Sequence, residues 1–436
     1  MKPPVRLNPL AAWWRRRDWV GLVVALSVPA AAAAQTTNNP PSPAPTSELR
    51  RLNFDEVTVQ GVRVSPGAGS YAGGGGQGPG SLDTPGVALP MSVASPAGGA
   101  SSNKNEWVAA PLPSLNPTFG FGLALGAGYL YRPAWAGTNS QPWVTGAGGY
   151  YAQNGSWAAG AAHKMNWDED HWRLLGGLAY ADLRYDFFGV GAGAGEAGQS
   201  VPLRQTAGGG LIELLRGVGQ HWYVGGRYVL ARVQTSVETS DLNIPPSLAG
   251  LPLRLDTQLA AFSLRLQRDT RDSTFYPTRG TLFDVDASFF APAVGSDYTF
   301  QNYAVAYNHY FTLATNQVLA VRGYGQVTSG DAPFFALASF GSGADLRGYT
   351  PGRYRDKMMF AVQAEYRWRF TQRFGLVAFG GVGSVAPDLS HFEQVLPSLG
   401  GGLRYVVAKK NQVSLRFDVA WGRDEHTFYL GIGEAF

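Results

Sequence analysis

The sequence predicts an all-β fold, a transmembrane antiparallel β-barrel with an exported N-terminal extension. From about Trp107 to Phe436, apolar and polar side chains alternate with a period of two. Glycine (57 residues) and aromatic residues (13%) are frequent, whereas charged residues make up only 15% of the chain, against roughly 25% in soluble domains. The mean hydropathy is −0.11, as expected when polar side chains facing a lumen offset apolar side chains facing lipid.

Residues 1–34 have the three parts of a secretory signal peptide. Lys2, Arg6 and Arg15–Arg17 form a basic region, Val20–Val28 form an apolar region, and Ala30–Ala34 offer an A-x-A cleavage site. The apolar run is shorter than the roughly 20 residues that a spanning helix needs. A chain of this kind that enters the membrane must therefore form a closed barrel, because lipid offers no partner to unpaired backbone groups.

Residues 35–104 are dominated by Pro, Gly, Ser, Ala, Thr and Asn, as in PPSPAPTS and GAGSYAGGGGQGPGS. This composition cannot bury a core, so we expect a mostly disordered periplasmic linker. Phe54–Val64 (FDEVTVQGVRV) alternates like a strand. It is compatible with pairing to a sheet edge or a partner protein, but an ordinary β-prone linker segment is the preferred interpretation. Residues 105–436 then form the barrel.

The alternation is clearest from Met358 to Phe370. One face of this segment carries apolar side chains, namely Phe360, Val362, Ala364, Tyr366, Trp368 and Phe370. The opposite face carries Ala361, Gln363, Glu365, Arg367 and Arg369. In a soluble sandwich the charged face would meet water, whereas in a membrane barrel it lines the lumen. The signal peptide and the aromatic residue at position 436 favour the barrel.

The connections predict the topology. Short connections at 217–220, 313–317, 371–374 and 408–412 interleave with long ones at 189–202, 236–257, 331–357 and 386–397. Periplasmic turns and surface loops give this pattern. Fifteen clear strands lie between Phe119 and Phe436, and bacterial barrels have an even number. We therefore expect 16 strands, the first around Asn105–Ser114 despite Pro111 and Pro113; 14 strands is the alternative.

The sequence indicates neither an enzyme nor a cofactor. Gly193–Gly198 matches G-x-G-x-x-G but lacks a βαβ context, and no G-x-S-x-G motif occurs. The six His lack metal-ligand spacing and there is no Cys, so we predict no metal site. The net charge of +4 lies partly in the signal peptide, and no basic stripe indicates nucleic-acid binding. A hydrolase with an Asp/His pair at the lumen or rim is the remaining catalytic alternative.

Several motifs follow one another in residues 115–436. They are Asp269-Thr-Arg271-Asp272 with Pro277-Thr-Arg-Gly280, Leu346-Arg347-Gly348-Tyr349, Ala364-Glu365-Tyr366, Gly401-Gly402-Leu403-Arg404, Leu415-Arg416-Phe417-Asp418, and the ending from Phe428 to Phe436. In this order they resemble the BamA/TamA outer-membrane assembly family, also called bacterial surface antigens. The resemblance implies an outer-membrane barrel of a Gram-negative bacterium.

The resemblance also implies roles for particular residues. It places Asp269, Arg271, Asp272, Pro277 and Gly280 in a periplasmic turn, and Leu346, Arg347, Gly348 and Tyr349 at the tip of a surface loop that folds back into the lumen. Arg347 is then expected to pair with Glu365. The residue chemistry agrees, because Glu365 is on the lumen face and arginine binds carboxylates in a bidentate manner. Gly431 and Phe436 are expected in a targeting signal read by the barrel assembly machinery, with Glu434 where an apolar residue is usual.

Two departures from the family pattern matter. In the family's F-x-D-x-G strand, this chain has Gly381 at the acidic position, and Asp418 is a possible substitute because it lies on the lumen side of its strand. The family's periplasmic POTRA domains do not fit into residues 35–104, so the chain looks like a member lacking them. The resemblance implies a role in membrane insertion or translocation of proteins, with client proteins and outer-membrane lipids as partners. The alternative is a passive or loop-plugged pore or scaffold.

Overall fold

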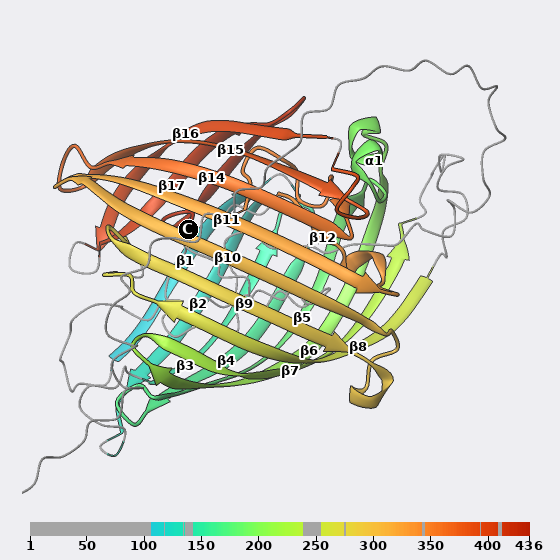
Figure 1. Cartoon of the computed structure of the whole chain (residues 1–436), viewed down its shortest axis with the longest axis horizontal. Helices are drawn as coiled ribbons and strands as arrows, with labels where there is room; N and C mark the ends of the chain where they lie inside the picture. The colour runs from blue at the N-terminus through green and yellow to red at the C-terminus, as the bar shows by residue number, and fades with distance from the viewer. Residues whose placement is uncertain are drawn as a thin grey trace, which may run out of the picture. The chain divides into compact units, whose positions relative to one another are not determined.

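The computed structural model describes residues 106–116, 118–133, 135, 143–238, 254–273, 276–341, 345–392, 394–408 and 412–436. In this part of the chain, 16 antiparallel strands form a closed barrel (Figure 1). The predicted fold class and the higher of the two strand counts are thereby confirmed. The predicted signal peptide and linker, including residues 54–64, lie outside the described residues.

Most barrel strands pair with their neighbours in sequence; the exceptions are that β11 pairs with β14 and that β18 closes on β1. The barrel strands are β1 (Glu106–Asn116), β2 (Gly120–Tyr131), β3 (Trp143–Ala152), β4 (Trp157–Trp167), β5 (Trp172–Phe187), β6 (Val201–Gly219), β7 (Trp222–Val237), β8 (Arg254–Asp269), β9 (Gly280–Phe290), β10 (Phe300–Ala314), β11 (Gln317–Gly330), β14 (Met358–Trp368), β15 (Phe374–Ala386), β16 (Leu396–Ala408), β17 (Val413–Trp421) and β18 (His426–Ile432).

The connections carry few regular elements. They are helix α1 (Ala192–Ala197), the paired strands β12 (Ala338–Ser339) and β13 (Arg355–Asp356), and 3-10 turns at Pro292–Val294 and Phe334–Ala336. Within the described ranges, no helix has the length and apolar character needed to cross a membrane.

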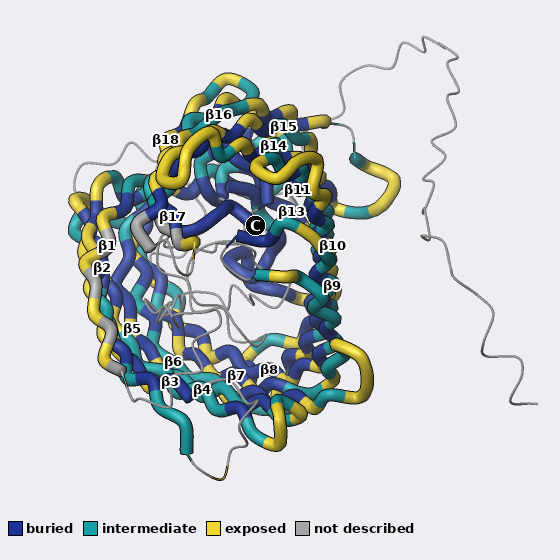
Figure 2. Tube along the Cα trace, turned by 90° about the vertical axis from the view of Figure 1, so that its left-hand side faces the viewer, coloured by how far each residue is buried: buried dark blue, intermediate teal, exposed yellow. Residues whose placement is uncertain are grey.

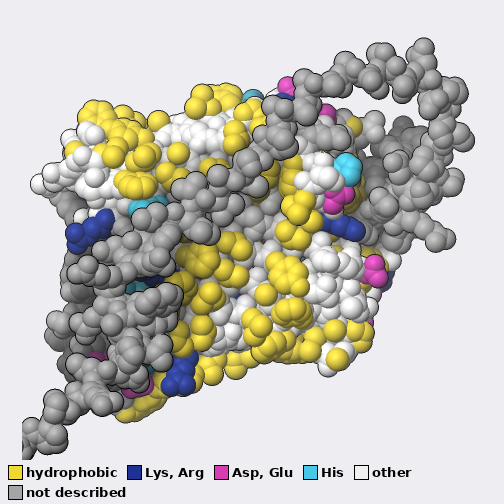
Figure 3. Space-filling model, viewed as in Figure 1, with side chains coloured by type: hydrophobic (Ala, Val, Ile, Leu, Met, Phe, Trp, Pro, Cys, Tyr) yellow, Lys and Arg dark blue, Asp and Glu magenta, His cyan; other side chains and the backbone are white. Residues whose placement is uncertain are grey.

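The side chains of β14 alternate between the lumen and the outer surface of the barrel. Gln363, Glu365 and Arg367 are buried inside the barrel, whereas Val362 and Trp368 are 47% and 40% exposed on its outer surface. The same alternation leaves hydrophobic side chains over much of the visible outer face (Figure 3). An apolar outer face with a polar lumen is the arrangement that lipid requires of a barrel.

The connections divide the barrel into two ends, which we call the loop end and the turn end. The long connections between β5 and β6, β7 and β8, β11 and β14, and β15 and β16 leave from the loop end, where α1 lies (Figure 1). The short connections β4–β5, β6–β7, β10–β11, β14–β15 and β16–β17 lie at the turn end, where β1 starts and β18 ends. The longer β2–β3 and β8–β9 connections, residues 132–142 and 270–279, lie at this end as well. The turn between β6 and β7 is shorter than predicted, because β6 continues to Gly219 through an irregularity at Gly217/Gly219.

A buried apolar cluster holds the β11–β14 connection inside the loop end. Phe334 and Phe335 of this connection pack in one cluster with Phe187, Phe290 and Phe300 from the surrounding strands. The ring centroids of Phe187 and Phe334 are 5.3 Å apart, and those of Phe290 and Phe300 are 4.0 Å apart. Burial of these rings favours a connection folded into the lumen over one extended into water.

The contact between β1 and β18, which we call the seam, is the sparsest strand pairing of the barrel. Among the described residues, one register pair joins the two strands, Leu115 with Leu430, whereas all 11 residues of β1 pair with β2. β18 has only seven residues, and Pro111 and Pro113 in β1 have no N–H to donate. Fewer backbone hydrogen bonds therefore hold the seam than hold the other strand pairs.

The register of the seam predicts a specific cross-link. Directly opposed residues of antiparallel strands have Cα atoms about 4.5–5.5 Å apart, which suits a disulfide, and the natural chain has no Cys. The double variant Leu115→Cys/Leu430→Cys is therefore expected to form an intramolecular disulfide on mild oxidation, seen as a reducible mobility shift in electrophoresis. In the control Leu115→Cys/Phe428→Cys, the second cysteine lies two residues before Leu430 on the same face of β18, and this variant should cross-link poorly. Equal yields would contradict the register.

Candidate functional site

The β11–β14 connection brings a four-residue motif deep into the barrel. Leu346, Arg347 and Tyr349 are fully buried, and Gly348 between them is buried as well. Burial of an arginine is costly unless the protein supplies anionic partners. The position of Arg347 therefore depends on the lumen wall around it.

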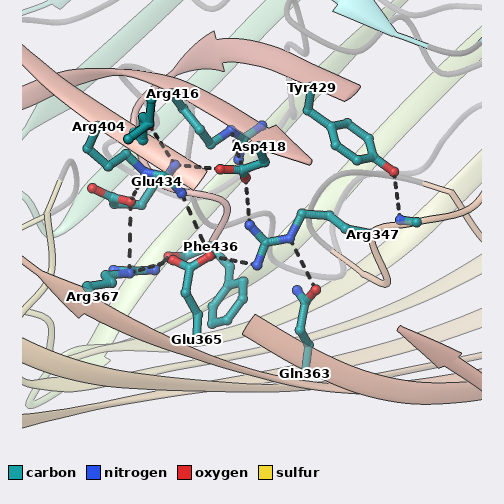
Figure 4. A network of polar contacts seen from close by, with 12 residues as sticks. Arg347, Gln363, Glu365, Arg367, Arg404, Arg416, Asp418, Tyr429, Glu434 and Phe436 are labelled. Carbon is teal, nitrogen blue, oxygen red and sulfur yellow. Dashed lines mark hydrogen bonds and ion pairs between the residues drawn. The ribbon is translucent and has the colours of Figure 1, made fainter. Parts of the chain in front are cut away.

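Two carboxylates surround the Arg347 guanidinium (Figure 4). Its Nη2 lies 2.6 Å from Glu365 Oε2 and its Nη1 lies 2.7 Å from Asp418 Oδ2. Its Nε donates a hydrogen bond of 3.2 Å to Gln363 Oε1, and its Cζ lies 3.3 Å from the centre of the Phe379 ring. The contacts come from β14, β15 and β17, so one side chain attaches the loop to three strands.

The structure therefore brings together Arg347 and the two carboxylates named from the sequence. Glu365 reaches the lumen because it alternates with outward-facing residues on β14, and Asp418 does so on β17. All three side chains are fully buried. Their contribution to the activity of the protein stays a prediction.

Three further arginines extend the site, which we call the lumen charge network. It consists of Arg347, Glu365, Arg367, Arg404, Arg416, Asp418 and Glu434 (Figure 4). Arg404 lies at its centre, with Nη1 2.5 Å from Asp418 Oδ1 and Nε 2.7 Å from Glu434 Oε2. Arg367 Nε lies 2.7 Å from Glu365 Oε1. With four guanidiniums and three carboxylates, nearly all charge in this buried group is compensated internally.

Some members of this network lie in motifs noted in the sequence but had no predicted role. Arg404 ends the Gly-Gly-Leu-Arg motif and Arg416 belongs to the Leu-Arg-Phe-Asp motif. Gln363 and Phe379 also contact Arg347, and both lie on the lumen faces of alternating strands. The period of two was the signal that could have identified them, because it places each of these residues on the same face as Glu365 or Asp418.

Gly381 lies where the resemblance led us to expect an acidic residue, and the structure leaves little room for a side chain there. A Cβ at this position would lie 2.5 Å from the Val362 carbonyl oxygen and 2.9 Å from Leu346 Cδ1. Leu346 of the loop thus packs where a side chain at position 381 would begin. The second carboxylate reaches Arg347 from β17 instead, as Asp418.

Gly348 allows the loop to approach the turn between β17 and β18. Its φ of +107° lies in the region that favours glycine, and a Cβ would come within 2.9 Å of the Gly422 nitrogen. Its N–H donates a 3.0 Å hydrogen bond to Tyr429 Oη on β18. This close approach fixes the motif against the last two strands of the barrel.

Tyr349 and Thr350 continue the attachment. Tyr349 Oη donates to the Pro397 carbonyl at 2.5 Å and accepts from the Arg423 N–H at 3.1 Å. Burial raises the pKa of Tyr349 to about 12, so the hydroxyl keeps its proton at neutral pH. Thr350 donates to Glu425 through both its N–H, at 2.9 Å, and its hydroxyl, at 2.7 Å.

The turn predicted from the resemblance connects β8 and β9 at the turn end. It contains Asp269, Arg271, Asp272, Pro277 and Gly280. Arg271 Nη2 pairs with Asp269 at 2.8 Å, and Asp272 accepts hydrogen bonds from the Thr278 N–H and hydroxyl at 2.9 and 2.5 Å. Gly280 has a φ of +97°, and a Cβ there would meet the Thr270 carbonyl oxygen at 2.2 Å. These residues stabilise the turn itself.

The end of the chain departs from the expectation that Phe436 lies on an alternating strand. Gly431 is part of β18, but this strand ends at Ile432. Gly433 then adopts a φ of +80°, and the last three residues are buried in the lumen, where the end of the chain appears inside the ring of strands (Figure 2). A role of Gly431 and Phe436 in targeting stays a prediction.

Charge pairing and ring packing explain this turn into the lumen. Glu434 supplies a carboxylate to Arg404, and the Phe436 main-chain oxygen accepts a 2.7 Å hydrogen bond from Arg367 Nη2. The Phe436 ring belongs to a buried cluster with Tyr276 and Tyr310. A glutamate would be unusual on a lipid-facing strand, but Glu434 lies inside the barrel, where its carboxylate pairs with Arg404.

A second buried charge cluster lies on β6–β9. Glu213 lies 2.8 Å from Arg227 and 3.2 Å from Arg265, and Arg265 lies 2.8 Å from Asp284. Asp286 lies 3.3 Å from Arg227. These ion pairs join adjacent strands and also strands two positions apart, β6 with β8 and β7 with β9. Among the described residues, no group of three or more His, Asp or Glu side chains could hold a metal ion.

Comparisons with known proteins agree on one family. Residues 135–436 match the Omp85 superfamily domain. The chain is 30% identical over 183 residues to the outer membrane protein assembly factor BamA of Nitratidesulfovibrio vulgaris (strain Hildenborough), which covers 37% of this chain. The match spans only 23% of the length of that curated relative.

Solved structures share the fold at low sequence identity. BamA from Haemophilus ducreyi lacking POTRA domains 1–3 aligns with a TM-score of 0.54 and 14% identity, over 75% of this chain and 70% of the other. CdiB from Escherichia coli aligns with a TM-score of 0.52 and 10% identity, over 74% and 62%. CdiB from Acinetobacter baumannii gives 0.50 and 13%, over 75% and 59%.

The network predicts that Arg347→Ala loosens the loop. Glu365 and Asp418 would each lose a buried counter-ion, which costs about 3–5 kcal/mol when one partner of a buried pair is removed. We expect a lower urea midpoint for the barrel in micelles and new protease cleavage within residues 331–357. Arg232→Ala is the matched control, because Arg232 forms an exposed pair with Asp256, and water screens such a pair. Unchanged protection and stability in Arg347→Ala would contradict the proposed attachment.

Proposed function

Because the chain belongs to the Omp85 superfamily, we propose that it acts in the insertion or translocation of proteins at the outer membrane. Its turn end, with the N-terminal extension, would face the periplasm, and client proteins and outer-membrane lipids would be its partners. The barrel assembly machinery would insert it during biogenesis. The proposal involves no catalytic residue or cofactor.

The sparse seam between β1 and β18 is the observation that carries the proposal. An unpaired strand edge is a template for pairing with another chain. Opening the barrel at the seam breaks fewer backbone hydrogen bonds than opening it elsewhere, since β18 is short and β1 contains two prolines. A client strand could pair with the freed edge of β1 or β18 while its apolar face enters lipid.

The lumen charge network supports this function by keeping the rest of the barrel closed. Arg347 connects the loop to β14 and β17, and Gly348 connects it to β18. The strands adjacent to the seam are therefore supported from the lumen side rather than by the seam itself. This arrangement allows the seam to open while the remaining strands keep their register.

A loop-plugged scaffold without insertase activity is the second candidate. It is favoured by the contents of the lumen, because the β11–β14 connection and residues 434–436 are buried there. A plugged barrel would conduct ions poorly, and the Arg347→Ala variant would conduct better. Such a result would describe the lumen without requiring any action on clients.

The two candidates differ in their effect on a client. We expect a small client barrel to fold a few-fold faster in liposomes that contain this protein than in empty liposomes. The Leu115→Cys/Leu430→Cys variant should lose this acceleration when oxidised and regain it on reduction, because the disulfide closes the seam. The readout is the heat-modifiable gel shift of the folded client over time. No acceleration by the folded natural chain would favour the scaffold, and equal acceleration by the oxidised variant would exclude the seam.

A further inference from the structure

A row of aromatic and arginine side chains crosses the outer face of β4–β9 at the turn end. In the order of the strands, the row contains Trp167, Trp172, Arg216, Trp222, Arg268 and Phe283. Cross-strand register pairs Trp167 with Trp172, Trp172 with Arg216, Trp222 with Arg268 and Arg268 with Phe283. These residues share the outward face of the barrel with the apolar residues that follow along each strand.

The two arginines of this row face rings instead of carboxylates. Arg216 Cζ lies 5.2 Å from the centre of the Trp172 ring, and Arg268 Cζ lies 5.7 Å from that of Trp222. In the part of the chain that the structure describes, neither forms an ion pair, and Arg268 Nε is buried without a hydrogen-bond acceptor. A ring face attracts a cation but satisfies none of its N–H donors.

At the loop end, outward-facing arginines on these strands pair with carboxylates. Arg204 on β6 lies 2.6 Å from Asp182, and Arg232 on β7 lies 3.1 Å from Asp256. There the protein supplies the counter-ion on the neighbouring strand. At the turn end the cross-strand neighbours are Trp172 and Val224 for Arg216, and Trp222 and Phe283 for Arg268. These neighbours offer no carboxylate, so an anion for either arginine would come from outside the protein.

We propose that Arg216 and Arg268 bind the phosphate groups of anionic phospholipids at the turn-end interface of the membrane. A guanidinium presents a planar set of donors that matches phosphate oxygens, and tryptophan rings hold a barrel at headgroup depth. The arginines lie two strands apart, on β6 and β8, so about 10 Å of sheet separates them and each can bind its own headgroup.

The proposed lipid site does not depend on the proposed action on client proteins. It requires only that the barrel lie in a membrane with its apolar face in lipid. If the turn end faces the periplasm, as proposed above, the ligands are phospholipids of the periplasmic leaflet. If the protein did not accelerate client folding, the proposed lipid site would be unaffected. If phosphatidylglycerol did not bind to Arg216 and Arg268, the proposed action on client proteins would be unaffected.

The test measures binding of phosphatidylglycerol to the purified, folded barrel in micelles by native mass spectrometry. We compare the natural chain, the variant Arg216→Gln/Arg268→Gln and the matched control Arg204→Gln/Arg232→Gln. The test variant should weaken binding about 30-fold, which corresponds to roughly 2 kcal/mol, or about 1 kcal/mol for each basic residue near anionic lipid. The control should bind like the natural chain. If the double variant does not fold, each single variant should weaken binding about fivefold.

Three outcomes would overturn the proposal. The first is unchanged phosphatidylglycerol binding by Arg216→Gln/Arg268→Gln, and the second is an equal loss in the loop-end control. The third is displacement of the lipid by inorganic phosphate at the same concentration, which would indicate a site for free phosphate rather than for a membrane headgroup.

Discussion

The burial of one guanidinium between two carboxylates is the constraint on which the rest of this barrel depends. Arg347 cannot stay inside the lumen without Glu365 and Asp418, and these carboxylates cannot stay charged there without arginines. Satisfying this requirement brings the β11–β14 connection down into the lumen and holds it against β14, β15 and β17. The apolar cluster around Phe334 and the hydrogen bond from Gly348 to Tyr429 then fix the two sides of the same connection.

The network also links parts of the chain that are distant in sequence. Arg404 contacts Asp418, which holds the loop, and Glu434, which holds the end of the chain inside the lumen. The residues that turn away from β18 are thus attached to the group that positions the loop. The short β18 and its sparse pairing with β1 follow from this, because residues 434–436 are used for lumen contacts instead of further strand pairing.

The sequence predicted the wall of the barrel better than its contents. Alternation along β14 and β17 placed Glu365 and Asp418 on the lumen face, and the resemblance supplied Arg347 as their partner. Phe436 was expected on the last strand, because alternation describes local geometry and does not reveal that Arg404 and Arg367 lie across the lumen. For the same reason, the packing of Leu346 over Gly381 could not be predicted, because it depends on where the loop lies in the closed barrel. The cluster around Arg265 depends on the register of β6–β9, which alternation does not give.

The most direct test of this account is the coupling between Arg347 and Asp418 in a double-mutant cycle. The free energy of unfolding in micelles would be measured for the natural chain, Arg347→Ala, Asp418→Ala and the double variant. Residues in one buried ion-pair network couple by about 0.5–3 kcal/mol, and we expect a value above about 1 kcal/mol. Additive effects, with a coupling near zero, would contradict the claim that this pair holds the loop in the lumen.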